Sequence, residues 1–295
     1  MSSHTICVVG SANIDTTYSV RQIPGPGETI LADARRVSHG GKGANQAAAA
    51  AASGGSVAMI ATVGDDENGA AAVHDLEVRG VDVDGIARTS ERATGNAVIL
   101  VGADGENLIV VDPGANHALE ADWVAQHVGR LDPAVMLAQL EIPTAALIAA
   151  AGAAPDATFV LNPAPMPADV KELDDLLETV DVLVPNRTEL AQLVGLAEPQ
   201  TADEVDHCAS LLDFDGTLVV TLGADGAVIY SGSRRIGAVP AVDVVPVDTS
   251  GAGDAFCGGL AHHLALGESM EDAVHRATAL AGQSTTHRGA RLPLG

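Results

Sequence analysis

An acid in a glycine-rich turn is the first residue in this sequence that could do chemistry. The stretch VDTSGAGDAF, residues 247–256, places two glycines around one alanine, followed by Asp254 and an apolar run. A glycine-rich turn that opens a helix exposes backbone N–H groups, and the helix dipole adds positive potential there. Such a turn binds anions, notably phosphate. Asp254 could therefore act on a bound group, or it could simply be an acid favoured in a first helical turn.

A lysine between glycines is the second candidate, in GGKGANQ at residues 40–46. The chain contains only two lysines, Lys42 and Lys171, so a solvated face explains this one poorly. The glycines would let the backbone approach a ligand, and Asn45 offers both a donor and an acceptor. The alternative is a tight turn into an alanine-rich packing helix.

Polar residues also follow two of the expected strands. Asn13 and Asp15 come after the first strand and share one side of an extended segment, and Glu141 follows the strand VMLAQLE. In doubly wound folds, ligands bind beyond the carboxyl ends of strands, and paired amide and carboxylate groups suit sugar hydroxyls. Turn capping is the alternative for each residue alone.

The stretch VPNRTEL places Asn186 and Glu189 three residues apart at a helix start. This spacing predicts a capping box, with Asn at the N-cap and Glu at the third helical position. The same pair could instead orient water around a metal ion.

Other common motifs are missing from the sequence. GAGDAF has Phe256 where a dinucleotide fingerprint needs a small residue, and GGKGA has Gly43 where a Walker A loop needs Ser or Thr. There is no HExxH motif or Cys/His cluster, which argues against a structural zinc site. The missing dinucleotide fingerprint argues against an NAD-dependent oxidoreductase.

The segments that must position these residues alternate between strand and helix. We expect strands at 4–10 and 56–62, and helices at 41–54 and 67–79. From residue 118 onward, helices are expected at 119–129, 143–152, 169–179, 187–194 and 202–212, with strands at 134–139, 157–161, 181–184 and 216–221. A hairpin at 226–238 and two final helices complete the pattern. This alternation predicts an α/β fold with a doubly wound, mostly parallel sheet flanked by helices.

Two β-rich interruptions, at about 15–38 and 83–112, do not fit that alternation. The second contains strand candidates near 83–88, 95–103 and 107–112, with a hairpin turn at ADGEN. We expect both interruptions to pair into a small β-sheet lid on a single α/β domain, residues 1–295.

The composition narrows the class of protein. Asp and Glu number 39 against 15 Lys and Arg, for a net charge of −24 over 295 residues, so a nucleic-acid partner is not expected. An acidic, lysine-poor chain with few aromatic residues is typical of a cytosolic protein in high salt. No apolar run is long enough to span a membrane, and no secretory signal is evident. The three cysteines have no CxxC spacing and are expected to be buried and reduced, which predicts a cytoplasmic location.

Taken together, these segments resemble the ribokinase family of sugar kinases within the PfkB carbohydrate kinase superfamily. The resemblance runs in family order through GSANID, GGKGANQAAAAAA, TVGDDENG, GANHAL, LNPAP, PNRTEL, VTLGADGA and DTSGAGDAFCGGL. It covers nearly the whole chain, and GGKGANQA and DTSGAGD are highly specific in combination.

The resemblance implies transfer of the γ-phosphoryl group of ATP to a primary sugar hydroxyl, first of all O5 of D-ribose. Asp254 would be the catalytic base, with the N–H groups of Gly251, Ala252 and Gly253 stabilising the transferring phosphoryl group. Residues matching sugar-binding positions are Asn13, Asp15, Gly41, Lys42, Asn45 and Glu141. Residues matching nucleotide positions are Asn186, Glu189, Thr221 and Gly223, with Asn186 and Glu189 organising Mg²⁺ through water.

The resemblance also implies a monovalent cation, usually K⁺, held by Asp248 and by carbonyl groups near Ser250 and Gly289. The lid would close over the sugar and form a homodimer contact. Ribose 1-phosphate or another sugar phosphate stays open as the substrate, because the cations Arg21, Arg88, Arg92 and His39 lie in or beside the lid segments. A nucleoside also stays open, and it would need an open pocket beyond C1. A non-catalytic sugar or nucleotide sensor is the rival of another class, and the presence of Asp254 and Lys42 argues against it.

Overall fold

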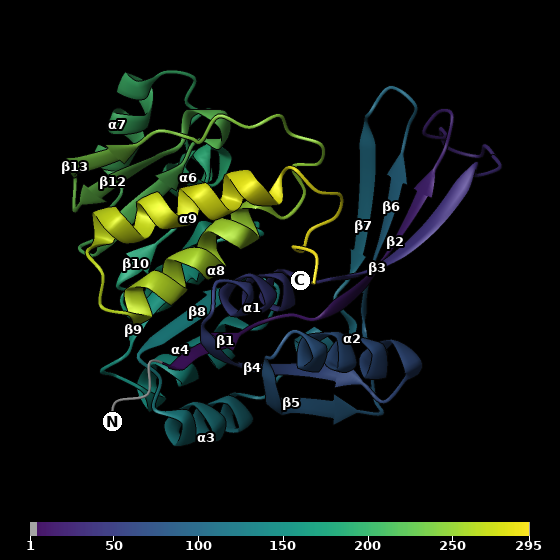
Figure 1. Cartoon of the computed structure of the whole chain (residues 1–295), viewed down its shortest axis with the longest axis horizontal. Coiled ribbons are helices and arrows are strands. Elements are labelled where there is room, and N and C mark those ends of the chain that lie inside the picture. The colour runs from purple at the N-terminus through teal and green to yellow at the C-terminus, as the bar shows by residue number, and fades with distance from the viewer. Residues whose placement is uncertain (1–4, 295) are drawn as a thin grey trace.

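A large, mostly parallel sheet forms the body of the protein, as the computed structural model of residues 5–294 shows (Figure 1). The nine strands follow the order β13-β12-β11-β10-β9-β8-β1-β4-β5. The parallel strands are β1 (Thr5–Val9), β4 (Ser56–Gly64), β5 (Asp82–Thr89), β8 (Val135–Gln139), β9 (Thr158–Asn162), β10 (Val182–Leu183) and β11 (Thr217–Thr221). A hairpin of β12 (Ala227–Ser231) and β13 (Arg234–Val239) adds antiparallel strands at one edge. The predicted fold class is confirmed.

Helices cover both faces of this sheet. One face packs against α1 (Lys42–Ala52), α2 (Glu67–Val78), α8 (Ala252–Ala265) and α9 (Met270–Ser284). The other packs against α3 (Ala121–Leu131), α4 (Thr144–Ala153), α5 (Asp174–Leu177), α6 (Arg187–Val194) and α7 (Ala202–Leu211). Along β1, Ile6 and Val8 face the first layer, whereas Cys7 and Val9 face the second. A strand buried on both faces is apolar throughout, which explains the continuous apolar run ICVV.

The helix expected at 169–179 is shorter than predicted. It consists of a 3₁₀ turn, Val170–Leu173, followed by the single turn of α5. The Asp169 side chain accepts a hydrogen bond from the backbone N–H of Lys171, which supports the tight first turn. All three cysteines are buried and free, as expected. Among the described residues, no helix combines the length and apolar composition needed to cross a bilayer.

A second, four-stranded sheet, which we call the lid after its expected role, stands beside the body (Figure 1). Its order is β3-β2-β6-β7, from β2 (Asn13–Ser19), β3 (Ala34–Gly40), β6 (Gly95–Val101) and β7 (Asn107–Asp112). Strand β2 pairs parallel with β6, and the two outer pairings are antiparallel. Two chain segments far apart in sequence therefore build one small sheet, as predicted.

The assignment of residues 83–88 to the lid is wrong. These residues lie in β5, which pairs parallel with β4 at the edge of the main sheet. Gly85 lies against β4 so closely that an added Cβ would come within 2.8 Å of the Met59 carbonyl oxygen. Trp123 also donates an indole hydrogen bond to the Gly85 carbonyl at 2.9 Å. Helix α2 supplies the crossover from β4 to β5, so the second lid insertion begins at Gly95.

The order of the strands locates the crevice. The chain moves from β1 outward to β4 and β5, then returns to β8 on the other side of β1. Ligands of doubly wound sheets bind at such a reversal, beyond the carboxyl ends of the strands. The lid strand β2 begins just after β1, so the small sheet starts beside this crevice.

Candidate active site

The site forms where the N-terminal ends of α1 and α8 meet. These helices pack at backbone distance because Gly258 has no side chain: an added Cβ would come within 2.5 Å of the Gln46 carbonyl oxygen. It would also come within 2.8 Å of the Ala50 nitrogen. This close approach brings the polar residues at the start of α1 against Asp254 in the first turn of α8.

Asp254 is buried and held by the side chains of α1. Its Oδ2 accepts a hydrogen bond from Asn45 Nδ2 at 3.0 Å, and its Oδ1 accepts one from Gln46 Nε2 at 3.1 Å. Burial raises the pKa of this carboxyl group, although Lys42 and both amides act to lower it. An acid that only caps its own helix would not need partners from a second helix, so this arrangement favours chemistry over capping.

Gln46 and its partners are residues that sequence reasoning missed. The side chain of Gln46 is fully buried and also donates to Asn162 Oδ1 at 3.2 Å. Its Oε1 accepts a hydrogen bond from Gln139 Nε2 at 2.6 Å. A buried amide chain thus fixes Gln46 behind Asp254. The available signal was a glutamine directly before six alanines in GGKGANQAAAAAA.

A cavity of about 210 Å³ opens in front of Asp254. It is lined by Lys42, Asn162, Val184, Asn186, Glu189, Thr221, Thr249, Gly251, Ala252, Gly253, Asp254 and Cys257. Burial alone would lower the pKa of Lys42, but the carboxylates of Asp254, Glu141 and Glu189 raise it above its ordinary value. The cavity is therefore lined by one ammonium group, of Lys42, and two carboxylates, of Asp254 and Glu189. Gly223 lies outside the lining, in an exposed 3₁₀ turn.

The residues expected to hold a sugar lie at the base of the lid. Buried Asn13 accepts a hydrogen bond through Oδ1 from Asn116 Nδ2 at 2.6 Å. Burial and the nearby carboxylate of Glu141 raise the pKa of Asp15 to about 6. Gly41 has φ 85°, and an added Cβ would come within 2.8 Å of the Asn13 nitrogen. The sequence did not identify Asn116, which lies in GANHAL.

Glu141 links the loop that follows β1 to the start of α1. Its Oε2 accepts hydrogen bonds from the Ser11 hydroxyl and from the backbone N–H of Lys42, the latter at 2.9 Å. This contact fixes the start of α1 beneath the lid. Of the predicted sugar-binding residues, Asn45 bonds to Asp254 directly, and the charges of Lys42, Glu141 and Asp15 lie near enough to interact with it.

The glycine-rich turn lies on the other side of Asp254. Gly251 is the N-cap of α8 with φ 73°, and no side chain caps this helix. The backbone N–H of Ala252 donates to the Thr249 carbonyl at 3.3 Å, and Gly253 is exposed. An uncapped helix start that faces a cavity suits an anionic group.

Asp248 links this turn to the loop at 286–290. It accepts backbone hydrogen bonds from Ser250 and Gly289, both at 2.9 Å. Burial acts to raise the pKa of Asp248, but these N–H groups outweigh it and lower the pKa. The three residues predicted to surround a monovalent cation are therefore neighbours.

Asn186 and Glu189 form the predicted capping box at the start of α6. Asn186 Oδ1 accepts from the Glu189 N–H at 2.8 Å, and Glu189 Oε2 accepts from the Asn186 N–H at 2.9 Å. Burial raises the pKa of Glu189. Both residues also line the cavity, so capping and a role toward a ligand are compatible. No cluster of three or more His, Cys, Asp or Glu side chains that could bind a metal occurs within residues 5–294.

The four cations considered for a phosphorylated substrate, Arg21, Arg88, Arg92 and His39, do not line the cavity in front of Asp254. Arg21 is 91% exposed, and its nearest acid is Asp33 at 3.9 Å. His39 lies 4.0 Å from Asp75, and Arg88 belongs to β5 of the main sheet. Arg92 is exposed as well, so only His39 adjoins the residues expected to hold the sugar.

A doubly wound sheet and a buried carboxylate beside a phosphate-type turn fit a phosphotransferase of small molecules. The model of the pfkB family carbohydrate kinases matches residues 3–294, and the chain belongs to this family. It is therefore a kinase whose acceptor is a sugar hydroxyl.

The chain is also similar to individual members of this family. The chain is 36% identical to the ribokinase of Haemophilus influenzae, over 97% of this chain and 94% of that protein. It is 34% identical to a deoxyribokinase of Salmonella typhi, over 96% and 93%. A solved structure of Arabidopsis thaliana ribokinase complexed with ribose and ATP has a TM-score of 0.84 and 30% identity, over 98% of this chain and 95% of that one.

Proposed function

We propose that this protein is an ATP-dependent ribose kinase that transfers the γ-phosphoryl group to O5 of D-ribose and forms ribose 5-phosphate. One observation carries the proposal: buried Asp254 lies between the sugar-type residues at the lid base and the glycine turn of α8. Similarity to ribokinases over almost the full length, including one complexed with ribose and ATP, supports the choice of sugar and nucleotide.

We infer a role for each side of the site. Asp254 takes the proton of the attacking hydroxyl, because its carboxylate is buried and oriented by two amides. Gly251, Ala252 and Gly253 line the cavity, and their backbone N–H groups would stabilise the charge of the transferring group. Asn13, Asp15 and the residues around Gly41 hold the sugar, while Thr221 and the exposed turn at Gly223 meet the nucleotide. Positioning and electrostatics supply most of the catalysis in such a transfer.

The charge of the cavity fits a magnesium ion. A triphosphate that entered beside Asp254 and Glu189 would be repelled if Lys42 were the only counter-charge. Oxygen ligands and water suit Mg²⁺, which would neutralise the phosphate oxygens when bound. Asn186 and Glu189 would hold its water shell.

A substrate panel tests the proposed function. Purified protein with ATP and Mg²⁺ in molar KCl would be assayed with ribose, deoxyribose, ribose 1-phosphate, cytidine, guanosine, fructose 1-phosphate and 2-keto-3-deoxygluconate. We expect the highest kcat/KM with ribose and a product phosphorylated at O5, identified by ³¹P and ¹³C NMR. A higher kcat/KM with any other acceptor would reject ribose as the substrate.

We also propose that K⁺ binds beside the glycine turn, at Asp248 and the carbonyl groups near Ser250 and Gly289. The lowered pKa of Asp248 keeps its negative charge available, and the carboxylate connects the two loops. At constant ionic strength, we expect severalfold higher kcat in K⁺ than in tetramethylammonium, and we expect Asp248→Ala to lose this difference. Equal rates of the wild-type protein in both salts would contradict the cation site.

The outer face of the lid is proposed to join two copies of the chain. Val98 pairs with Val110 and Leu100 pairs with Leu108, on the face opposite to Asp15. Val110 is 58% exposed and Leu108 is 43% exposed, and an apolar sheet face of this kind marks an interaction site. We expect sedimentation velocity to show a dimer that Val110→Lys converts to a monomer. Val245→Lys, at an 85% exposed valine outside the lid, should leave the dimer intact. A monomeric wild type would contradict the proposal.

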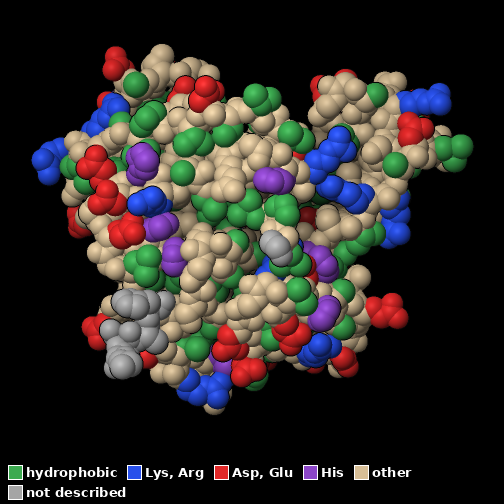
Figure 2. Space-filling model, viewed as in Figure 1, with side chains coloured by type: hydrophobic (Ala, Val, Ile, Leu, Met, Phe, Trp, Pro, Cys, Tyr) green, Lys and Arg blue, Asp and Glu red, His purple; other side chains and the backbone are tan. Residues whose placement is uncertain are grey.

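We further propose that the protein works in the cytoplasm at high salt. Acidic side chains are spread over the visible face rather than gathered in one patch (Figure 2), and the net charge is −24. Salt at about 1 M shortens the Debye length to roughly 3 Å and thereby screens this self-repulsion. We expect the unfolding midpoint, measured by circular dichroism, to rise as KCl increases from millimolar to molar concentration. A midpoint that is flat or falls with KCl would contradict adaptation to salt.

A further inference from the structure

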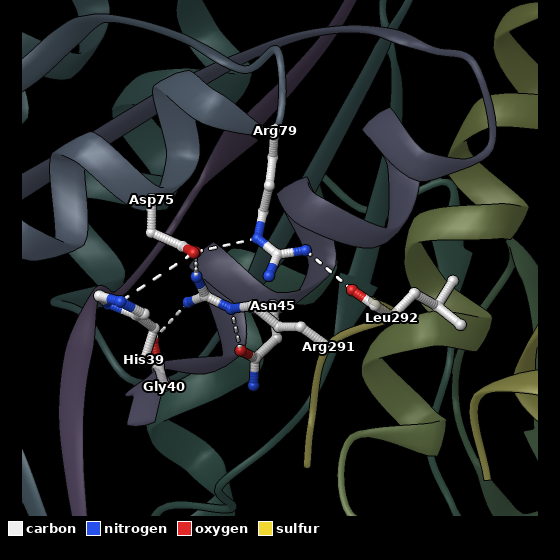
Figure 3. A network of polar contacts seen from close by, with 7 residues as sticks. All are labelled: His39, Gly40, Asn45, Asp75, Arg79, Arg291 and Leu292. Atoms are coloured by element: carbon white, nitrogen blue, oxygen red, sulfur yellow. Dashed lines mark hydrogen bonds and ion pairs between the residues drawn. The ribbon is translucent and has the colours of Figure 1, made fainter. Parts of the chain in front are cut away.

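A cluster of buried charges beside the sugar side of the site has no role in the chemistry described above. It joins Arg291 to Asp75 and Arg79 of the α2 region, with His39 nearby (Figure 3). The side chain of Arg291 is only 6% exposed, although arginine is usually a surface residue. A buried guanidinium needs several partners to offset its lost hydration.

Arg291 contacts three different elements. Its Nε donates to Asn45 Oδ1 at 2.8 Å, and Nη2 donates to the Gly40 carbonyl at 3.0 Å. Its Nη1 donates to Asp75 Oδ2, which also accepts from Arg79 Nε at 3.0 Å. The planar guanidinium carries donors in fixed directions, so it can hold these acceptors in one geometry. Gly40 ends the lid strand β3, and Asn45 lies at the start of α1.

The contact with Asn45 selects one of two amide orientations. The oxygen and nitrogen of a side-chain amide have nearly the same shape, so the amide could rotate by half a turn. Arg291 Nε can only donate, and therefore requires the Asn45 oxygen to face it. The Asn45 nitrogen must then point at Asp254, where it donates to Oδ2 at 3.0 Å. The opposite orientation would place the amide oxygen against the carboxylate.

We propose that Arg291 is a positioning residue, which fixes the Asn45 amide toward Asp254 and holds the Gly40 carbonyl where the lid joins α1. The inference rests on the proposed role of Asp254 as the base. Arg291 itself does not touch the reacting atoms: it acts through Asn45. Asp75 holds the guanidinium in place, and Arg79 anchors the same segment by donating to the Leu292 carbonyl at 2.9 Å.

Arg79→Met is a matched control for Arg291→Met. Each variant removes a guanidinium from the same carboxylate and a contact of the segment 291–292, but only Arg291 touches Asn45 and Gly40. With the acceptor that the wild type uses best, we expect Arg291→Met to lower kcat by about 10- to 100-fold, the size of effect that a misplaced catalytic group produces. The KM for the sugar should rise, while the KM for ATP should not change. Arg79→Met should keep kcat at the wild-type level, even if its unfolding midpoint falls as much as that of Arg291→Met.

Two further variants define the mechanism. Arg291→Lys keeps the ion pair with Asp75 but cannot reach all three acceptors, so it should fold and still lose kcat. In an Asn45→Ala background, Arg291→Met should lower kcat little further, because the amide that Arg291 orients is gone. Equal kcat losses in Arg291→Met and Arg79→Met, or an undiminished loss in the Asn45→Ala background, would overturn the proposal.

An activity-independent measurement separates this inference from the proposed function. In ¹⁵N-asparagine-labelled protein, the side-chain NH₂ signal of Asn45, assigned by its loss in Asn45→Ala, reports the amide orientation. It should shift in Arg291→Lys and Arg291→Met but stay in place in Arg79→Met. An unmoved signal in both Arg291 variants would reject the positioning role, whichever sugar the enzyme phosphorylates.

Discussion

Replacing Asp254 with Asn should lower kcat by roughly 100- to 10,000-fold, the contribution of a well-placed general base. An amide cannot take the hydroxyl proton, although it fills the same space. The neighbours should not adapt, because Arg291 holds the Asn45 amide and Gln139 holds the Gln46 amide. One of these donors would then face the new NH₂ group. Sugar and ATP binding, measured by calorimetry, should persist because the other contacts remain.

Asp272 offers a matched control for Asp254→Asn. Both acids occupy the third position of their helix, in α8 and in α9, but Asp272 is exposed and bonds to Ser269. Asp272→Asn should therefore leave kcat unchanged. Near-normal turnover in Asp254→Asn would remove Asp254 as the base and return it to a helix-terminus role.

Replacing Gly251 with Ala should have the second large effect, on both activity and stability. Gly251 has φ 73°, where a residue with a side chain costs about 1–3 kcal/mol. An added Cβ would also come within 2.4 Å of the Ala290 carbonyl oxygen and 2.7 Å of its Cα. Either α8 or the loop at 286–290 must then move, which displaces the N–H groups of the glycine turn from the phosphate. We expect kcat to fall by about 100-fold, as for other displaced catalytic groups.

Gly253 serves as the control for stability. It lies two residues further along the same turn without a positive φ, and an added Cβ would meet no atom within 4 Å. Gly253→Ala should therefore have the same free energy of unfolding as the wild type, measured by urea titration. If Gly251→Ala is as stable and as active as the wild type, the turn does not depend on close contact with Ala290.

Short-range patterns in the sequence predicted most of the fold and part of the site. The helix at 187–194 matches α6, because its capping box is written in adjacent residues. Strand β5 was misplaced because it lies at the sheet edge, where its half-exposed residues look like a lid strand. Its pairing with β4 depends on the crossover through α2, which local composition does not reveal.

The remaining parts of the site could not be predicted for a related reason. Gln46 and Arg291 act through residues that are 208 and 246 positions away, and neither lies in a local pattern that names its partner. Asp254, Lys42 and Asn45 were found because unusual residue types stand within glycine-rich motifs. The sequence motifs thus pointed to the groups at the helix ends. The residues that orient these groups can be recognised only in the folded structure, where distant segments pack together.

The close packing of α1 against α8 has a consequence for synthesis of the protein. Asn45 leaves the ribosome long before its partner Asp254, 209 positions later. Contacts so distant in sequence form late, and a partly made chain exposes the apolar surface of α1 until α8 arrives. The alanine-rich α1 has little bulk to bury and limits the area that could drive premature association. The small alanine side chains that allow α1 and α8 to pack closely in the folded enzyme would also lower the tendency of the incomplete chain to aggregate.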